Sequence, residues 1–165
     1  MAVKLIVMYG YLFMQWPSHE DADVATLASK IPMFHRDLAK ESPGKKFIVV
    51  SVAVPGAVLP SAELSRKLRT ILVELTPKYF QEVHIVIEAK DTYGSLMRTI
   101  LGFFLTLKMG APVHIYRSVT DCLEAVPKNW YTLPGALTAA VKAGMFTGEQ
   151  VRPFISSRYS SQASP

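Results

Sequence analysis

The segment 89–95 combines the side chains best suited to chemistry in this chain. It reads AKDTYGS and places an acid, hydroxyl groups and a glycine where a helix is predicted to begin. Helix amino ends bind anions through free N–H groups and the helix dipole, and a phosphate on Thr92 or Ser95 would be stabilised by the same geometry. The simpler alternative is that Asp91 or Thr92 only caps the helix. The segment predicts a switch or anion-binding loop, formed by Asp91, Thr92, Gly94 and Ser95.

The histidines and the cysteine offer weaker signals. A zinc site needs three or four converging ligands, and these residues show no paired ligand spacing, so we predict no metal site. His84 and His114 fall in predicted strands, where each is expected to be a hydrogen-bonded core residue or a half-buried one. If those strands are neighbours, the two imidazoles could instead share a proton or a metal ion. Cys122 is interpreted as a small buried hydrophobic residue, because no base can be assigned to activate it.

The chain shows no constellation that would make it an enzyme. Neither a Gly-x-Gly-x-x-Gly pattern nor a Walker sequence occurs, so no nucleotide cofactor is expected. We assign no catalytic residue and predict a non-enzymatic protein without cofactors. A minor activity at the Asp91 loop is an alternative, which would require that Asp91→Asn abolish it while the fold survives.

The stretch 83–116 must position the predicted loop. It reads as an apolar strand, a turn, a long apolar helix, a second turn at Gly110 and a second strand. Parallel neighbours need a crossover of a dozen or more residues, and sequential strands usually lie side by side. The stretch therefore predicts two parallel central strands covered by a helix.

The remaining elements complete a single α/β domain. Strands are expected over residues 4–14 and 47–54, and helices from the acidic segment after Ser18, from the N-cap Ser61, over 118–126 and from Pro134. Pro32 is expected to kink or break the first of these helices, and Thr76-Pro77 to end the second. We predict one domain over 1–150 with a mostly parallel four-stranded sheet and helices on its faces. Residues 151–165 are expected to form a tail that is largely disordered.

The predicted helix after residue 95 is more apolar than one sheet face requires. A core-facing stripe is widened by Met97, Leu101 and Leu105. The added residues would be covered by the C-terminal segment or by a second subunit. The first option suggests a ligand pocket beneath that segment, with the candidate residues Arg98, Phe103, Phe104, Trp130 and Tyr131.

Composition narrows the classes of partner. The chain has 165 residues and a formal net charge of +5, but its basic residues are scattered without an aromatic-interleaved stripe, so nucleic-acid binding is not expected. One cysteine fits a reducing, cytoplasmic compartment. The longest uncharged apolar run of the central helix is too short to span a membrane, which takes about 20 residues.

The tetrad Asp91-Thr92-Tyr93-Gly94 and the order strand, helix, strand, helix, strand resemble the STAS domains of anti-sigma-factor antagonists. Residues 46–126 are similar to bacterial STAS/SEC14-like proteins. In the antagonists an Asp-Ser-Ser-Gly tetrad opens a helix and carries a regulatory phosphorylation, so the resemblance implies that Thr92 occupies the switch position.

Two functions from different classes follow. The first is a non-enzymatic, STAS-like regulatory or scaffolding domain that binds a protein partner and self-associates through the Met97, Leu101 and Leu105 side of its helix. The second is a carrier for a small apolar or anionic ligand.

Overall fold

The computed structural model describes residues 3–17, 20–54, 60–88 and 109–155. The strands of this part are β1 (Lys4–Met8), β2 (Tyr11–Trp16), β3 (Phe47–Ala53), β4 (Phe80–Ile87) and β5 (Val113–Tyr116). The helices are α1 (Asp21–Glu41), α2 (Ala62–Tyr79), α4 (Val119–Ala125), α5 (Leu133–Lys142) and α6 (Gly148–Ile155). The predicted α/β class is confirmed. Within the described residues, no helix is long and apolar enough to cross a membrane.

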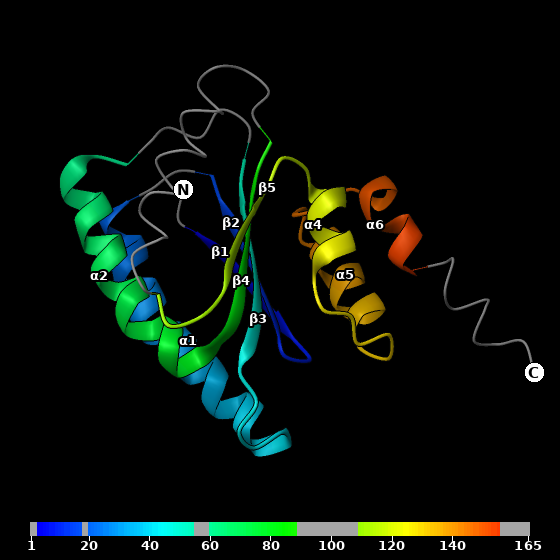
Figure 1. The fold of residues 1–165 in the computed structure, drawn as a ribbon, viewed down its shortest axis with the longest axis horizontal. Coiled ribbons are helices and arrows are strands. Elements are labelled where there is room, and N and C mark those ends of the chain that lie inside the picture. Colours follow the sequence, from blue (N-terminus) through cyan, green and yellow to red (C-terminus); the bar gives the residue numbers. More distant parts are fainter. Residues whose placement is uncertain (1–2, 18–19, 55–59, 89–108, 156–165) are drawn as a thin grey trace, which may run out of the picture.

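The sheet has five strands in the order β1-β2-β3-β4-β5, so the four-stranded prediction is wrong (Figure 1). β1 pairs with β2 antiparallel, and the remaining pairs are parallel. The extra strand arises because the segment predicted as one strand over 4–14 folds back on itself at Tyr9 and Gly10, whose φ angles are +54° and +85°. Positive φ at both central residues is typical of the tight turn that joins two hairpin strands. The predicted parallel pairing of the strands at 83 and 113 is confirmed by β4 and β5.

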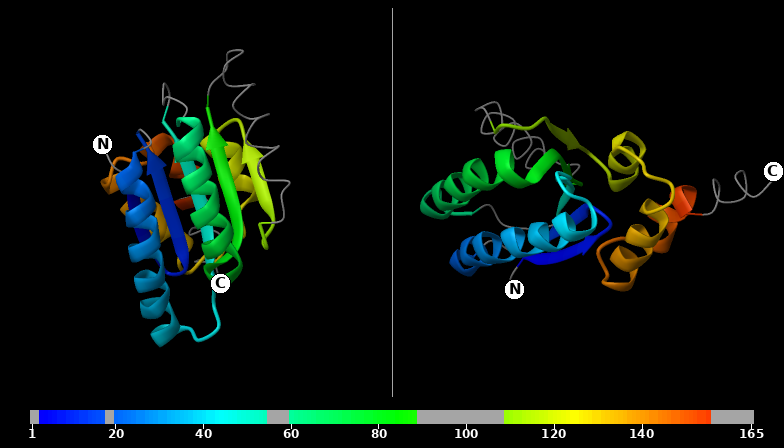
Figure 2. Two further views of the ribbon diagram at one scale, coloured as in Figure 1. Left: turned by 90° about the vertical axis from the view of Figure 1, so that its left-hand side faces the viewer. Right: turned by 90° about the horizontal axis from the view of Figure 1, so that it is seen from below.

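Helices cover both faces of the sheet. Figures 1 and 2 show α1 and α2 on one face and α4, α5 and α6 on the other. Alternation along the strands separates two apolar cores: Leu12 and Val49 pack in the core beside α1 and α2, whereas Phe13 and Val50 pack in the core beside α4, α5 and α6. The side chains at 82, 84, 114 and 116 therefore lie on the face covered by the C-terminal helices.

The predicted break at Pro32 and the predicted helix end at Thr76-Pro77 are wrong. α1 continues through Pro32 to Glu41, because Leu27, Ile31 and Leu38 are buried on one side of it and this packing outweighs the backbone hydrogen bond that proline cannot make. Pro77 likewise lies inside the last turn of α2. The strand that follows therefore begins at Phe80, before the predicted start at residue 83.

The predicted caps of α2 and α4 agree with the structure. Ser61 Oγ accepts a hydrogen bond from the backbone N–H of Leu64, and Ser118 Oγ accepts one from that of Asp121. Pro134 lies in the first turn of α5. The helix α6 was not predicted. It buries Val151 and Phe154, so residues 151–155 belong to the folded domain, and residues 156–165 of the predicted tail lie outside the described part.

A buried carboxylate fixes the start of the first strand. Asp23 is fully buried in the first turn of α1. Its Oδ1 accepts a hydrogen bond from the backbone N–H of Val3 at 2.7 Å, and its Oδ2 accepts one from that of Glu20 at 2.8 Å. This side chain therefore ties β1 to α1.

Candidate functional site

Most of the predicted site residues cannot be placed. The switch loop of Asp91, Thr92, Gly94 and Ser95 and the interface of Met97, Leu101 and Leu105 lie outside the described residues, as do Arg98, Phe103 and Phe104 of the predicted pocket. The described candidates are Trp130 and Tyr131, in the loop between α4 and α5.

Trp130 and Tyr131 have opposite surroundings. Trp130 packs half-buried against the core under the C-terminal helices, whereas Tyr131 is 91% exposed. A single exposed hydrophobic residue is ordinary on a protein surface, so the exposure of Tyr131 gains meaning only from the loop and the neighbours that hold it. The exposure of Tyr131 fits a contact surface better than the wall of a closed cavity.

Hydrogen bonds hold the loop that carries Tyr131. The hydroxyl of Tyr11, on β2, donates to the carbonyl of Pro127 at 2.8 Å and accepts from the backbone N–H of Asn129 at 3.0 Å. The Asn129 side chain accepts from the backbone N–H of Tyr131 at 3.1 Å. Burial raises the pKa of Tyr11, partly offset by the Asn129 bond, so the hydroxyl keeps its proton for the carbonyl. The backbone at Tyr131 is therefore anchored to the sheet.

The hairpin turn lies beside this loop. Tyr9 is 53% exposed despite its size, and its φ of +54° is unusual for a residue with a bulky side chain. A Cβ added at Gly135, in the first turn of α5, would come within 3.2 Å of the Tyr9 ring, so that ring packs over the glycine. Tyr9 and Tyr131 thus lie at the same end of α5. We call Tyr9, Trp130 and Tyr131 the aromatic surface.

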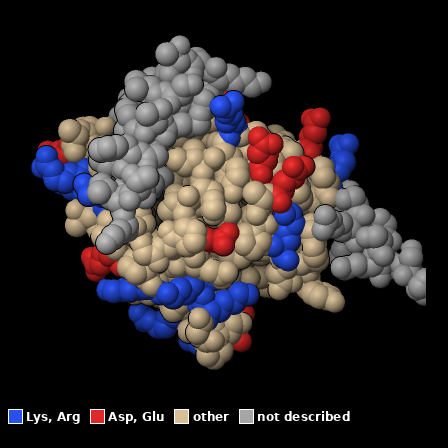
Figure 3. All heavy atoms as spheres, in the orientation of Figure 1, with Lys and Arg blue, Asp and Glu red and all other residues tan. Residues whose placement is uncertain are grey.

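Charges of both signs lie on the face drawn in Figure 3. Lysine and arginine side chains gather along its lower edge, at the end of the molecule where α1 and the β1–β2 hairpin end in Figure 1. Lys45 belongs to this end, since its side chain lies against Gly10 of the hairpin turn. A partner bound to the aromatic surface would therefore lie near the positive charge of Lys45.

A second group of side chains lies where β4 and β5 pair. His84 and His114 are register partners on these strands, and their rings stack with centroids 5.1 Å apart. Their closeness, which the sequence allowed if the strands were neighbours, is confirmed. His84 is 1% exposed, whereas His114 faces solvent.

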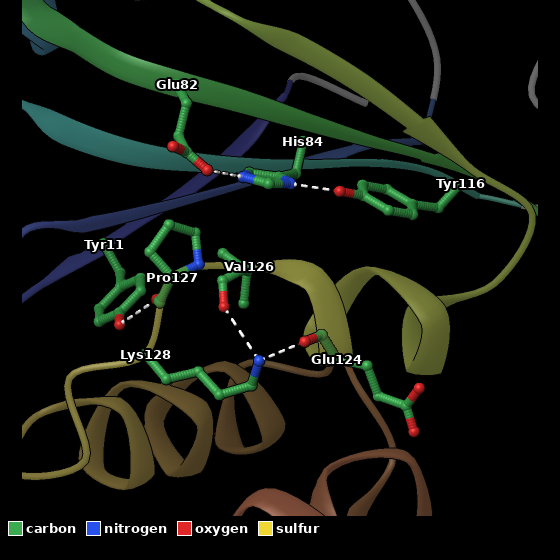
Figure 4. Close-up of polar contacts among 8 residues, drawn as sticks. All are labelled: Tyr11, Glu82, His84, Tyr116, Glu124, Val126, Pro127 and Lys128. Carbon is green, nitrogen blue, oxygen red and sulfur yellow. Dashed lines mark hydrogen bonds and ion pairs between the residues drawn. The ribbon is translucent and has the colours of Figure 1, made fainter.

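Glu82, His84 and Tyr116 form a hydrogen-bonded chain (Figure 4). His84 Nε2 is 2.5 Å from Glu82 Oε1, and His84 Nδ1 is 2.8 Å from the Tyr116 hydroxyl. An ionised carboxylate can only accept, so Nε2 carries the hydrogen of the neutral ring and Nδ1 accepts from the phenol. The chain therefore runs from a phenol through an imidazole to a carboxylate.

The electrostatic surroundings of His84 and Tyr116 keep the imidazole neutral and the phenol protonated. Burial lowers the pKa of His84, opposed by Glu82 and reinforced by the charges of His114 and Lys128. Figure 4 shows Lys128 below the ring, where its Nζ donates to the carbonyls of Glu124 and Val126. Burial, together with Cys122 and Glu82, raises the pKa of Tyr116 to about 12. The imidazole is therefore neutral and the phenol protonated near neutral pH.

His84 should make the protein less stable in acid. Because its folded-state pKa lies below its ordinary value, the unfolded chain binds more protons once the pH falls below about 6.5, so the free energy of unfolding should fall there. His84→Gln should flatten this loss, as measured by urea unfolding between pH 8 and pH 5. Parallel stability curves for the two proteins would show that Glu82, Tyr116, His114 and Lys128 do not perturb His84 in this way.

The cluster does not provide the ligands that a metal needs. Across residues 3–17, 20–54, 60–88 and 109–155, no group of three or more His, Cys, Asp or Glu side chains could hold a metal ion. Cys122 is fully buried, and burial raises the pKa of its thiol to about 12. It packs in the core as a small apolar residue, as predicted.

Sequence reasoning missed Glu82, Tyr116, Lys128, Tyr9 and Tyr11. Glu82 with His84, and His114 with Tyr116, are each two residues apart, so each pair shares a sheet face. That spacing could have identified each pair from the sequence. The register between β4 and β5, which brings the two pairs together, could not be predicted. Comparisons with protein-family models, curated proteins and solved structures found no match to this chain.

Proposed function

We propose that this chain is a non-enzymatic regulatory or scaffolding domain that acts by binding another protein. The single observation that carries the proposal is the exposed ring of Tyr131 on a loop anchored by Tyr11. Tyrosine and tryptophan are the residue types that most often dominate protein interfaces. Their rings bury a large area at the cost of few rotatable bonds.

Anchoring makes this ring a better contact residue. Ordering a loop on binding costs free energy, and a loop already fixed by hydrogen bonds avoids most of that cost. The Tyr11 and Asn129 contacts supply this order before any partner arrives. Tyr9 extends the aromatic surface, and Lys45 adds a positive charge at the neighbouring turn. The chemistry fits a partner with an apolar patch bordered by acidic side chains.

Further parts of the proposal rest on the sequence. They are a STAS-like, bacterial and cytoplasmic identity, a switch at Thr92, and self-association through Met97, Leu101 and Leu105. A second copy of the chain is accordingly the first partner to test.

The test combines native mass spectrometry of the chain isolated gently from its own cells with sedimentation at several concentrations. We expect dimers or a co-purifying protein, and Tyr131→Ala should weaken the association about tenfold, which corresponds to the loss of a modest interface hot spot. Val73→Ser is the matched control, because Val73 is also exposed but lies on α2, on the opposite face of the sheet.

Two results would contradict the proposal. A monomer that carries a discrete non-protein mass would favour the small-ligand carrier. Equal effects of Tyr131→Ala and Val73→Ser on an observed complex would remove the aromatic surface from the interface.

A further inference from the structure

The hydrogen bonds among Glu82, His84 and Tyr116 place a base, His84, where it can take the proton of the Tyr116 phenol. A hydroxyl becomes a nucleophile when a base lies within hydrogen-bond reach and a third group orients that base. Here Nδ1 of His84 accepts from the Tyr116 hydroxyl at 2.8 Å, and Glu82 holds Nε2 at 2.5 Å. Because the backbones of β4 and β5 are paired in register at these positions, the geometry is built into the sheet.

We propose that Tyr116 is a base-assisted acceptor of an acyl group from an activated ester or thioester, with His84 as the base and Glu82 as the residue that positions it. This site is separate from the aromatic surface and goes beyond the binding function. It needs a single transfer to the protein itself, so it does not make the chain an enzyme.

The step balances without any further reactant. The Tyr116 oxygen attacks the acyl carbon and forms a C–O bond, while its proton moves to Nδ1 of His84. The bond between the acyl carbon and the leaving group then breaks, and the leaving group departs with the electron pair. The imidazolium, stabilised by the carboxylate of Glu82, returns its proton to the leaving group or to water.

The raised pKa of Tyr116 makes the base necessary. With a pKa of about 12, the phenol is almost entirely protonated near neutral pH, so free phenolate contributes little to the reaction. Removal of the proton as the new bond forms avoids this barrier, and a strongly basic oxygen is intrinsically a good nucleophile.

The charge of the site favours an acyl group over a phosphoryl group. A phosphate on Tyr116 would add about two negative charges at neutral pH. Glu82 lies on the same hydrogen-bonded chain, and its charge would repel them. A neutral acyl ester adds no charge beside this carboxylate, and Tyr116 keeps part of its surface exposed.

The test uses N-acetylimidazole, an activated acyl donor, on the full chain, with peptide mapping by mass spectrometry to follow each tyrosine. Tyr131 is an internal comparison, because it is 91% exposed whereas Tyr116 is half-buried. If exposure alone governed reactivity, Tyr131 would react faster. We expect Tyr116 to react about tenfold faster, because general-base assistance of about a hundredfold is partly offset by its lower exposure.

Three variants separate the roles of the residues. Tyr116→Phe should remove the fast acetylation, and His84→Gln should bring Tyr116 down to the rate of Tyr131 or below. The acetylation rate of Tyr116 should fall in acid as His84 becomes protonated. Glu82→Gln should move this fall to lower pH, because it removes the negative charge that raises the pKa of His84 against the positive charges of His114 and Lys128. A merely structural role of Glu82 would leave the pH of this fall unchanged.

The proposal is overturned if Tyr116 in the unmodified chain reacts no faster than Tyr131. It is also overturned if a folded His84→Gln protein keeps the fast reaction. Should that variant fail to fold, the rate comparison in the unmodified chain and the pH profile of Glu82→Gln still decide the matter.

Discussion

Replacing Asp23 with alanine is expected to lower the free energy of unfolding by about 3 kcal/mol, because one buried and one partly buried backbone N–H group would lose a carboxylate acceptor at a cost of roughly 1–3 kcal/mol each. Those groups belong to Val3 and Glu20, so the loss would release β1 from α1. Urea unfolding followed by far-ultraviolet circular dichroism measures the change.

The amide variant gives a graded control. A side-chain amide keeps one acceptor oxygen in place of two, so Asp23→Asn should lose about half as much stability as Asp23→Ala. Asp21→Ala should have little effect, because Asp21 is an exposed acid in the same helical turn whose contact is a surface ion pair with Lys67. Equal effects of Asp23→Ala and Asp21→Ala would show that the buried contacts do not hold β1.

Local signals were sufficient for much of the fold. The continuous apolar run that forms β3 identified a strand buried on both faces, and the serines at 61 and 118 marked the starts of α2 and α4 because their hydroxyls satisfy free N–H groups. The spacing between residues 83 and 113 required a crossover, which predicted the parallel pairing of β4 and β5.

The failures share a cause, which is packing that overrides a local preference. Pro32 disfavours a helix locally, but the buried side chains on either side of it keep α1 continuous. Tyr9 is a poor residue for a turn with positive φ, so the hairpin was not recognised. The short helix α6 contains Pro153, and Val151 and Phe154 are buried in a core shared with α4 and α5.

The candidate sites needed information that one sequence does not contain. Period two along a strand places His84 beside Glu82 on one face, but only the register between β4 and β5 places Tyr116 within reach of the ring. The aromatic surface is similar, since Tyr131 was recognised as a candidate while its anchor, Tyr11, lies 118 residues before Asn129. Side chains that act together here are close in space through the sheet and distant in sequence.

The two sites also differ in what would disable them. The aromatic surface depends on the position of a loop, so it can be weakened without touching any residue that contacts a partner. The hydrogen bonds of Tyr116 depend on paired strands, but Lys128, whose charge helps to lower the pKa of His84, lies in the loop. A variant that loosens the loop therefore tests how far the loop and the sheet edge are coupled.

Tyr11→Phe is the variant that loosens the loop. It should lower the free energy of unfolding by about 2 kcal/mol, because the Pro127 carbonyl and the Asn129 N–H would both lose their partner. The ring of residue 11 stacks on Phe13 with centroids 6.1 Å apart, and phenylalanine keeps that contact, so the loss reports the hydroxyl alone. Urea unfolding measures the stability, and amide hydrogen exchange at Asn129 measures the opening of the loop.

The same variant links stability to binding. Partner affinity should fall although Tyr131 is unchanged, because the partner would then have to order a loose loop. Tyr131→Phe is the matched control: it removes an exposed hydroxyl, and it should leave stability and exchange at Asn129 as they were. Acetylation of Tyr116 should be unchanged in Tyr131→Phe, which leaves the Tyr11 hydrogen bonds on either side of Lys128 in place. If Tyr11→Phe left the exchange rate at Asn129 unchanged, the loop would be held by its own turn, through the Asn129 side chain, and the anchor would lie there instead.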